Sequence, residues 1–384
     1  MTGDLIYLDH NATTPVDPQV LDAMLPYLRD QLGNPSSDHP AGRVAARAVE
    51  QARGQVAALI GADPADIVFT SGGTESNNLA IRGSTAAAAP QRRRIVTTVV
   101  EHPATSAPCA HLHASGWTIT RLPVTSAGTI EVSAVAEAMA LDVALVTMML
   151  AQNETGAILP IPVVAAAAHA VGAAVHTDAA QAIGKIEVNV DALGVDLLSI
   201  AGHKCYAPKG VGALYRRPGT DLHPLLLGAG QEGGVRPGTE NVAGIVGLGA
   251  ACDLAGTRLA VEGTRLGHLR DSLWARLSAA IPDIVRHTPQ NSLPNTLMVS
   301  FPDVLGRSVL AASPGLAAST GSACHSGQDT PSATLLAMGA TPSVALGAVR
   351  LSLGHGTTAT DIDRAVSILT QAYGDCLANR GPGR

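Results

Sequence analysis

Short apolar runs alternate with helical patterns between about residues 65 and 215, and this alternation restricts the chain to few folds. The predicted strands cover residues 65–70, 94–100, 143–150, 174–177 and 195–200. Runs that are apolar throughout are typical of strands buried on both faces of a parallel sheet. Because helical segments separate the strands, the pattern predicts an α/β protein with a mostly parallel, helix-covered sheet.

Polar side chains follow these strands at the points where the strands end. They lie at residues 71–74, at His102, at Asn153, at residues 178–181, and at His203 and Lys204. Parallel strands bring their carboxyl ends to one edge of a sheet, and ligands bind there in open α/β folds. Each cluster alone is explained by an ordinary surface loop, but together they predict one site.

Lys204 is the residue of this set with the most specific chemistry. A lysine at the mouth of an α/β sheet can form a Schiff base with an aldehyde cofactor if its pKa is lowered. Asp178 precedes it by 26 residues, at the end of the previous predicted strand. A carboxylate for a pyridinium nitrogen, followed by a lysine for the aldehyde, is the order that a pyridoxal phosphate site needs. The alternative for the lysine alone is a solvated loop side chain.

Two glycine-rich segments also suggest binding. Gly72 and Gly73 end a strand and open a helix, an arrangement that holds phosphate through backbone N–H groups. An ordinary strand–helix turn with Thr74 as the N-cap explains the same residues equally well. Residues 228–241 form a polar loop too long for a simple turn, which indicates a functional or interface segment.

Two residues in the last third of the chain are further candidates. Cys324 lies among small and polar residues at 317–329, a setting for an accessible thiol. The alternative for a cysteine is a small buried hydrophobe. Arg350 interrupts an apolar predicted strand, so its guanidinium must find an anion. That anion is either a buried carboxylate of the protein or the carboxylate of a substrate.

Composition excludes several classes of protein. Aromatic residues make up 2% of the 384 residues and the net charge is −6, which disfavours nucleic-acid and anionic-membrane binding. No uninterrupted apolar run reaches membrane-spanning length, and the N-terminus resembles no secretory signal. The five cysteines form no Cys-x-x-Cys pair, so we expect free thiols, a cytoplasmic location and no metal site.

The ordered motifs resemble the cysteine desulfurases of the NifS/IscS type, which are pyridoxal 5'-phosphate enzymes of the class V aminotransferase superfamily. The matching segments are residues 11–15, 33–37, 70–78, 101–102, 153–156, 176–181, 202–204, 236–239, 321–324 and 349–351. The resemblance implies fold type I, with a large domain at 16–255 around a mostly parallel seven-stranded sheet. Residues 1–15 and 256–384 would form a smaller α+β domain with the nucleophile loop. It also implies a homodimer with active sites at its interface.

The resemblance assigns a cofactor role to each matching position. Lys204 would be the Schiff-base lysine, Asp178 would pair with the pyridinium nitrogen, and His102 would stack on the ring and transfer protons. The remaining contacts would be Asn153 and Gln181 to the phenolic oxygen, and Gly73, Thr74, His203 and the partner subunit's Thr239 to the phosphate. Ala201 stands where many relatives have serine, which removes one hydroxyl donor to that phosphate.

The resemblance also implies the substrate and the reaction. Asn34 and Arg350 would hold the carboxylate of L-cysteine, and Cys324 would take its sulfur as a persulfide while L-alanine leaves. A sulfur-acceptor protein, such as an iron–sulfur scaffold, would then receive the sulfur. His325 is similar to the residue of selenocysteine lyases, which keeps L-selenocysteine open as the substrate. A non-catalytic protein that binds the cofactor is a third alternative, which the joint presence of these residues disfavours.

Overall fold

The computed structural model describes residues 5–320 and 330–379, and in this part of the chain the strands form three sheets. The largest sheet contains β2 (Ile67–Thr70), β3 (Arg94–Thr98), β4 (Thr118–Leu122), β5 (Val143–Met149), β6 (Ala174–Asp178), β7 (Leu197–Ala201) and β8 (Gly212–Arg216). The two smaller sheets contain β9 (Val285–Arg286), β10 (Thr296–Ser300) and β12 (Ala348–Ser352), and β1 (Ile6–Tyr7) and β11 (Leu316–Ala317).

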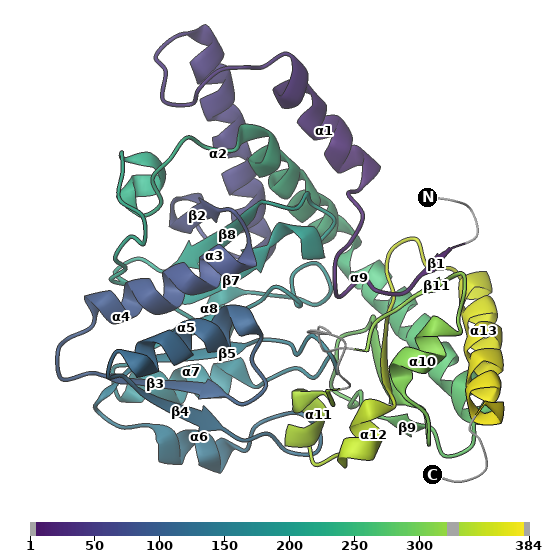
Figure 1. Cartoon of the computed structure of the whole chain (residues 1–384). Coiled ribbons are helices and arrows are strands. Elements are labelled where there is room, and N and C mark those ends of the chain that lie inside the picture. The colour runs from purple at the N-terminus through teal and green to yellow at the C-terminus, as the bar shows by residue number, and fades with distance from the viewer. Residues whose placement is uncertain (1–4, 321–329, 380–384) are drawn as a thin grey trace.

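Helices connect the strands and surround the large sheet (Figure 1). The first group is α1 (Pro18–Arg29), α2 (Pro40–Ile60), α3 (Gly73–Asn78), α4 (Ser84–Ala87), α5 (Pro103–Ala114), α6 (Val132–Ala138), α7 (Ile161–Ala170) and α8 (Val190–Leu193). The second group is α9 (Val242–Ala280), α10 (Gly306–Ala311), α11 (Ala333–Ala337), α12 (Pro342–Leu346) and α13 (Ala359–Ala378). Four short turns are η1 (Pro64–Asp66), the π-helical η2 (Leu79–Gly83), η3 (Gly202–Lys204) and η4 (Gln231–Gly234).

The seven-stranded sheet is mostly parallel, which confirms the predicted fold class. Its strand order is β2-β8-β7-β6-β5-β3-β4. The five strands from β7 to β4 in this order pair in parallel, whereas β8 is antiparallel to both β7 and β2. The carboxyl ends of β5, β6 and β7 therefore lie together at one edge of the sheet.

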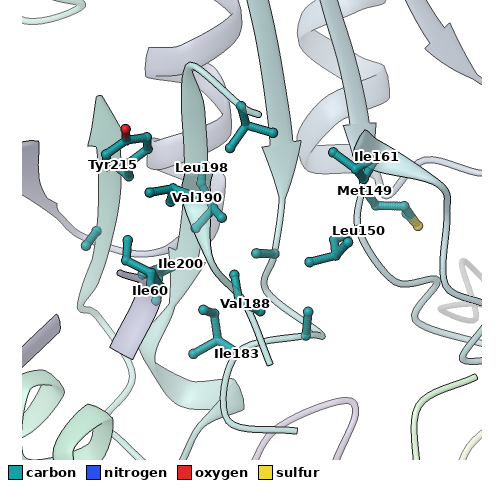
Figure 2. Close-up of a cluster of buried hydrophobic side chains, with 14 of the residues drawn as sticks. Ile60, Met149, Leu150, Ile161, Ile183, Val188, Val190, Leu198, Ile200 and Tyr215 are labelled. Atoms are coloured by element: carbon teal, nitrogen blue, oxygen red, sulfur yellow. The ribbon is translucent and has the colours of Figure 1, made fainter. Parts of the chain in front are cut away.

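Both faces of this sheet are buried, which explains why its strands are apolar throughout. Successive residues of a strand point to opposite faces. Leu145 of β5 packs in one cluster with Ile81 and Ile95, while its neighbour Val146 packs in another with Val164. Burial of each such side chain contributes about 1.5–3 kcal/mol. Figure 2 shows part of the second cluster, including Leu198 and Ile200 of β7 and Tyr215 of the neighbouring β8.

The 39-residue helix α9 links two hydrophobic cores. Its buried residues up to Ala255 pack against the large sheet and α2, whereas those from Leu266 onward join a second core with β10, β12 and α13. Ile6 and Leu8 also belong to the second core, which lies beside the large sheet in Figure 1. The expected division at residues 15/16 and 255/256 stays a prediction.

By length and composition, α9 is also a helix that could cross a membrane. Half of its most apolar window is buried inside the structure. Asp253 lies in this helix and interrupts its apolar run.

Candidate active site

A cavity of about 920 Å³ opens at the carboxyl edge of the large sheet. Residues from the N-terminal segment, from α3, from the strand ends and from β12 line it. Nine of the predicted site residues contribute to its wall: Gly73, Thr74, His102, Asn153, Asp178, Gln181, His203, Lys204 and Arg350. The fold thus brings together residues from positions 73 to 350 of the chain.

Lys204 lies in η3, directly after β7, and its ammonium is held by two backbone carbonyls. Nζ donates to the carbonyl oxygens of Asn11 and Ala12, at 2.6 and 2.8 Å. Burial, followed by repulsion from Arg350, lowers the pKa of Lys204 to about 8, although Asp178 and Asp9 oppose the shift. A substantial fraction of Lys204 is therefore a neutral amine near pH 8, which is the nucleophilic form.

Asp178 ends β6 and is buried at the base of the cavity. Its Oδ2 accepts a hydrogen bond from Asn77 Nδ2 at 2.6 Å, and its Oδ1 accepts one from the N–H of Ala180 at 2.9 Å. Asn77 was part of a matched motif but received no role from the sequence. Its Oδ1 atom is buried and, within the described residues, has no hydrogen-bond partner.

His102 is the N-cap of α5, and this position fixes its tautomer. Its Nδ1 accepts a hydrogen bond from the N–H of Ala104 at 3.1 Å, so any proton on the neutral ring is on Nε2. Loss of water, with repulsion from Lys204, lowers the pKa of His102, while Asp178 opposes this effect. A neutral His102 that carries its proton on Nε2 can therefore stack on a ligand or exchange that proton with it.

The start of α3 and the neighbouring His203 form the polar end of the cavity. Gly72 caps α3 without a side-chain hydrogen bond, and its φ of 144° favours glycine. A Cβ on Gly73 would lie 3.0 Å from the Cβ of Ala201, so a side chain there would crowd β7. Burial, together with the nearby Lys204, lowers the pKa of His203 to about 4, and its Nδ1 lies 3.2 Å from Thr13 Oγ1.

Arg350 has a protein carboxylate as its partner. Its Nη2 lies 2.8 Å from Asp9 Oδ1, and its Nη1 donates to the carbonyl of Asn153 at 3.0 Å. The Nε atom of Arg350 is buried and has no hydrogen-bond partner in the described part of the chain. The structure thus contains the protein carboxylate that the sequence analysis considered, and it leaves one donor of the guanidinium without an acceptor.

Two predicted site residues within the described part of the chain, Asn34 and Thr239, do not line the cavity. Asn34 is exposed between α1 and α2, where its Oδ1 accepts from the N–H of Ser36. Thr239 is exposed in the loop between η4 and α9. Cys324 lies outside the described residues. The roles predicted for all three stay predictions.

The sequence analysis also missed polar residues that support the site. Glu101 lines the cavity and accepts hydrogen bonds from Thr98 Oγ1 and the N–H of Met149, and burial raises its pKa to about 8. Asn11 accepts hydrogen bonds from Gln181, Lys185, Lys204 and Asn295. Both stand in matched motifs, which was the only signal for them. Within residues 5–320 and 330–379, no group of three His, Cys, Asp or Glu residues could hold a metal ion.

Comparisons with known proteins agree with this geometry. The Aminotransferase class-V family model matches residues 6–365. The cysteine desulfurase of Nostoc sp. is 46% identical over 370 residues, which cover 96% of this chain and 92% of that protein. A solved structure described as a NifS-like protein has a TM-score of 0.91 and 35% identity, and covers 97% of this chain and 100% of its own. A structure of SspA in complex with cysteine has a TM-score of 0.81 and 34% identity, and covers 90% and 98% of the two chains.

Proposed function

The chain belongs to the aminotransferase class-V family, and we propose that it is a cysteine desulfurase that uses pyridoxal 5'-phosphate. It would remove the sulfur of L-cysteine, release L-alanine and hold the sulfur as a persulfide on Cys324. The observation that carries the proposal is the placement of Asp178 and Lys204 at the ends of the adjacent parallel strands β6 and β7, on one cavity. An acid and a lysine so placed suit a cofactor with a pyridine nitrogen and an aldehyde.

The cavity residues fit this cofactor. The N–H groups at the start of α3 have no intrahelical partners and no side-chain cap, so they can bind a phosphate together with Thr74 and His203. Asp178, held by two donors, would pair with the pyridine nitrogen. Asn153 and Gln181 would contact the phenolic oxygen. Ala201 offers no hydroxyl, so the phosphate would depend more on backbone donors and on Thr239 of a partner subunit.

The protein's own groups would move the protons of the reaction. When bound, the cofactor withdraws electrons from the substrate carbon that carries the amine. Lys204, which has a pKa of about 8, would remove the proton from that carbon. His102 would exchange a second proton through Nε2, because its Nδ1 is occupied by the N–H of Ala104.

Arg350 would bind the carboxylate of the substrate. Its buried Nε atom supports this role, because it is a donor that faces no protein acceptor among the described residues. The substrate would share the guanidinium with Asp9 or displace it. Asn34 would complete the carboxylate site, and its exposed position means that the loop must rearrange or that two chains share the site.

Cys324 would act as the nucleophile for sulfur. Its thiolate would attack the sulfur of the substrate, so that an S–S bond forms while the bond between sulfur and Cβ breaks. The electron pair of the broken bond would pass to the carbon, and a proton would complete the methyl group of alanine. The reaction needs a partly ionised thiol that can reach the substrate.

The remaining parts of the proposal concern partners and location. We propose a homodimer, supported by the exposed position of Thr239, and a sulfur-acceptor protein such as an iron–sulfur scaffold. A cytoplasmic location is supported by the free state of Cys109, Cys205, Cys252 and Cys376.

The proposal is tested by incubating the purified protein with L-cysteine and, separately, with L-selenocysteine, and by quantifying the alanine formed from each. A cysteine desulfurase forms alanine from cysteine and a persulfide that maps to Cys324. The Cys324→Ala variant should keep the cofactor and its spectral response to cysteine, but should form no persulfide and little alanine. Alanine from selenocysteine alone would favour the lyase. No alanine from either substrate in the cofactor-loaded protein would contradict both activities.

A further inference from the structure

Lys185 is one of only three lysines in the chain, with Lys204 and Lys209, and the proposed reaction gives it no role. It lies in the turn that follows β6, four residues after Gln181. Backbone hydrogen bonds from Ile183 to Ala179 and from Lys185 to Ala182 wind this turn tightly. The turn therefore places the Lys185 and Gln181 side chains next to each other.

The side-chain nitrogen of Lys185 donates to two amide side chains. Its Nζ donates to Gln181 Oε1 at 2.8 Å and to Asn11 Oδ1 at 3.0 Å. A lysine nitrogen that donates to an amide must face its oxygen, so Lys185 determines which way the Gln181 amide points. The Asn11 amide has further partners, because its Oδ1 also accepts from Asn295 Nδ2 at 3.1 Å and its Nδ2 donates to Thr296 Oγ1 at 2.8 Å. The NH2 group of Gln181 is thereby turned away from Lys185, and it donates to the carbonyl of Asn11 at 2.9 Å.

Asn11 connects this arrangement to the rest of the site. Its carbonyl accepts from both Gln181 Nε2 and Lys204 Nζ. Its Nδ2 donates to the carbonyl of Asn153, which also accepts from Arg350. Asn11 is 1% exposed, so its alternative hydrogen-bond partners are protein groups rather than water. Loss of Lys185 would therefore remove the donor to Gln181 Oε1 and free the Gln181 amide to turn, whereas Asn11 would keep its hydrogen bonds with Asn295 and Thr296.

The electrostatic setting is consistent with a supporting role. Burial, with repulsion from Lys204 and Arg350, lowers the pKa of Lys185 well below its usual value. A neutral lysine amine keeps two N–H donors, and the structure provides two acceptors. Lys185 can thus hold both amides without placing a second full charge beside Lys204.

We propose that Lys185 is a positioning residue, which holds the NH2 group of Gln181 toward the phenolic oxygen of the bound cofactor. The inference rests on the proposed cofactor site. It adds a residue that does not line the cavity and that acts through Gln181.

The test compares two ligands in cofactor-free protein: pyridoxal 5'-phosphate and its 3-deoxy analogue, which lacks the phenolic oxygen. Lys185→Met should weaken binding of pyridoxal phosphate about tenfold, and that of the analogue less than about twofold, because one hydrogen bond to the oxygen is lost. Gln181→Leu should show the same preference. The double variant should bind pyridoxal phosphate no more weakly than Gln181→Leu alone, because the two residues act through one contact.

Equal weakening of both ligands by Lys185→Met, or additive effects in the double variant, would overturn the inference and leave Lys185 a structural residue. If wild-type protein binds neither ligand, the proposed cofactor site itself is wrong. Thermal unfolding without ligand checks that the variants fold. If Lys185→Met does not fold, wild-type protein labelled with ¹³C at the lysine ε-carbon decides the question. The Lys185 signal should differ between the two bound ligands, and identical signals would contradict the inference.

Discussion

Two regions of this molecule carry the proposed active-site residues. In one region the residues line the cavity, and in the other they are exposed to solvent. The strand-end region, with Lys204, Asp178 and His102, lines the cavity, and each of these groups has a fixed hydrogen-bond partner. The loop region, with Asn34 and Thr239, is exposed and lines no part of that cavity. In Figure 1 the loop between α1 and α2 projects away from the strand ends.

The difference shows that the fold of one chain positions the strand-end region but not the loop region. Parallel strands with both faces buried cannot shift without disrupting the core, so the groups at their ends are preorganised. The side chain of Asn34 instead accepts a hydrogen bond from the N–H of Ser36 within its own loop. We therefore expect the cofactor half of the site to depend on this chain alone, and the remaining contacts to depend on a second chain.

The largest expected effect concerns the strand-end region. Lys204→Ala should lower alanine formation by about 10²–10⁴-fold, because the proton-transferring amine is lost. The variant should still fold and bind the cofactor without a covalent bond. Borohydride reduction and peptide mapping of the wild type should place the cofactor on Lys204. Labelling of Lys185 or Lys209 instead would remove Lys204 from the mechanism.

The next effect concerns the substrate contact. Arg350→Ala should lower kcat/KM for L-cysteine, because the substrate carboxylate loses a buried partner. The loss of interaction free energy should be about 2–5 kcal/mol. Cofactor content should not change. Asp9→Asn is the matched control, since it removes the protein carboxylate but keeps the guanidinium. If both variants lose stability equally while KM stays constant, Arg350 serves only to pair with Asp9.

The pH dependence of Lys204 tests how strongly the strand-end region is preorganised. In cofactor-free protein, acylation of Lys204 should rise with pH around a midpoint of about 8, because the ammonium form below that pH is not nucleophilic. Arg350→Ala should move the midpoint upward, since the repulsion that favours the neutral amine is removed. Peptide mapping resolves the site easily in a chain with three lysines. A midpoint near the ordinary lysine value of 10.5 would show that the site is more hydrated than this structure.

The smallest effect concerns the loop region. Thr239→Ala should weaken cofactor binding roughly fivefold, because one hydrogen bond to the phosphate is lost. Thr239→Ala subunits can then be mixed with Lys204→Ala subunits to form hybrid dimers. One site of each hybrid would combine Lys204 of the first subunit with Thr239 of the second, so both residues would be intact there. A fraction of sites with wild-type affinity should then appear in the titration. Its absence after subunit exchange would place Thr239 in its own chain's site, or in none.

Sequence patterns predicted much of this fold because a strand buried on both faces is a run of apolar residues, which can be read from the sequence. The expected strands at 94–100, 143–150 and 174–177 correspond to β3, β5 and β6. The short β4 was not predicted, because three of its five residues are polar and the strand lies at the edge of the sheet. The later half of helix α9, from Leu266 onward, packs in the second core, a contact between distant segments that no local pattern specifies.

Order along the chain was also enough to place the principal site residues at one edge of the sheet. The sequence determined that Asp178, His203 and Lys204 follow buried strands, and parallel strands must end together. Tertiary structure alone decided their partners. Asn77 meets Asp178 across 101 positions, Asp9 meets Arg350 across 341, and Lys185 meets Asn11 across 174. Local periodicity reflects which face of a strand or helix is buried, but such pairs depend on how distant segments pack, which no local pattern specifies.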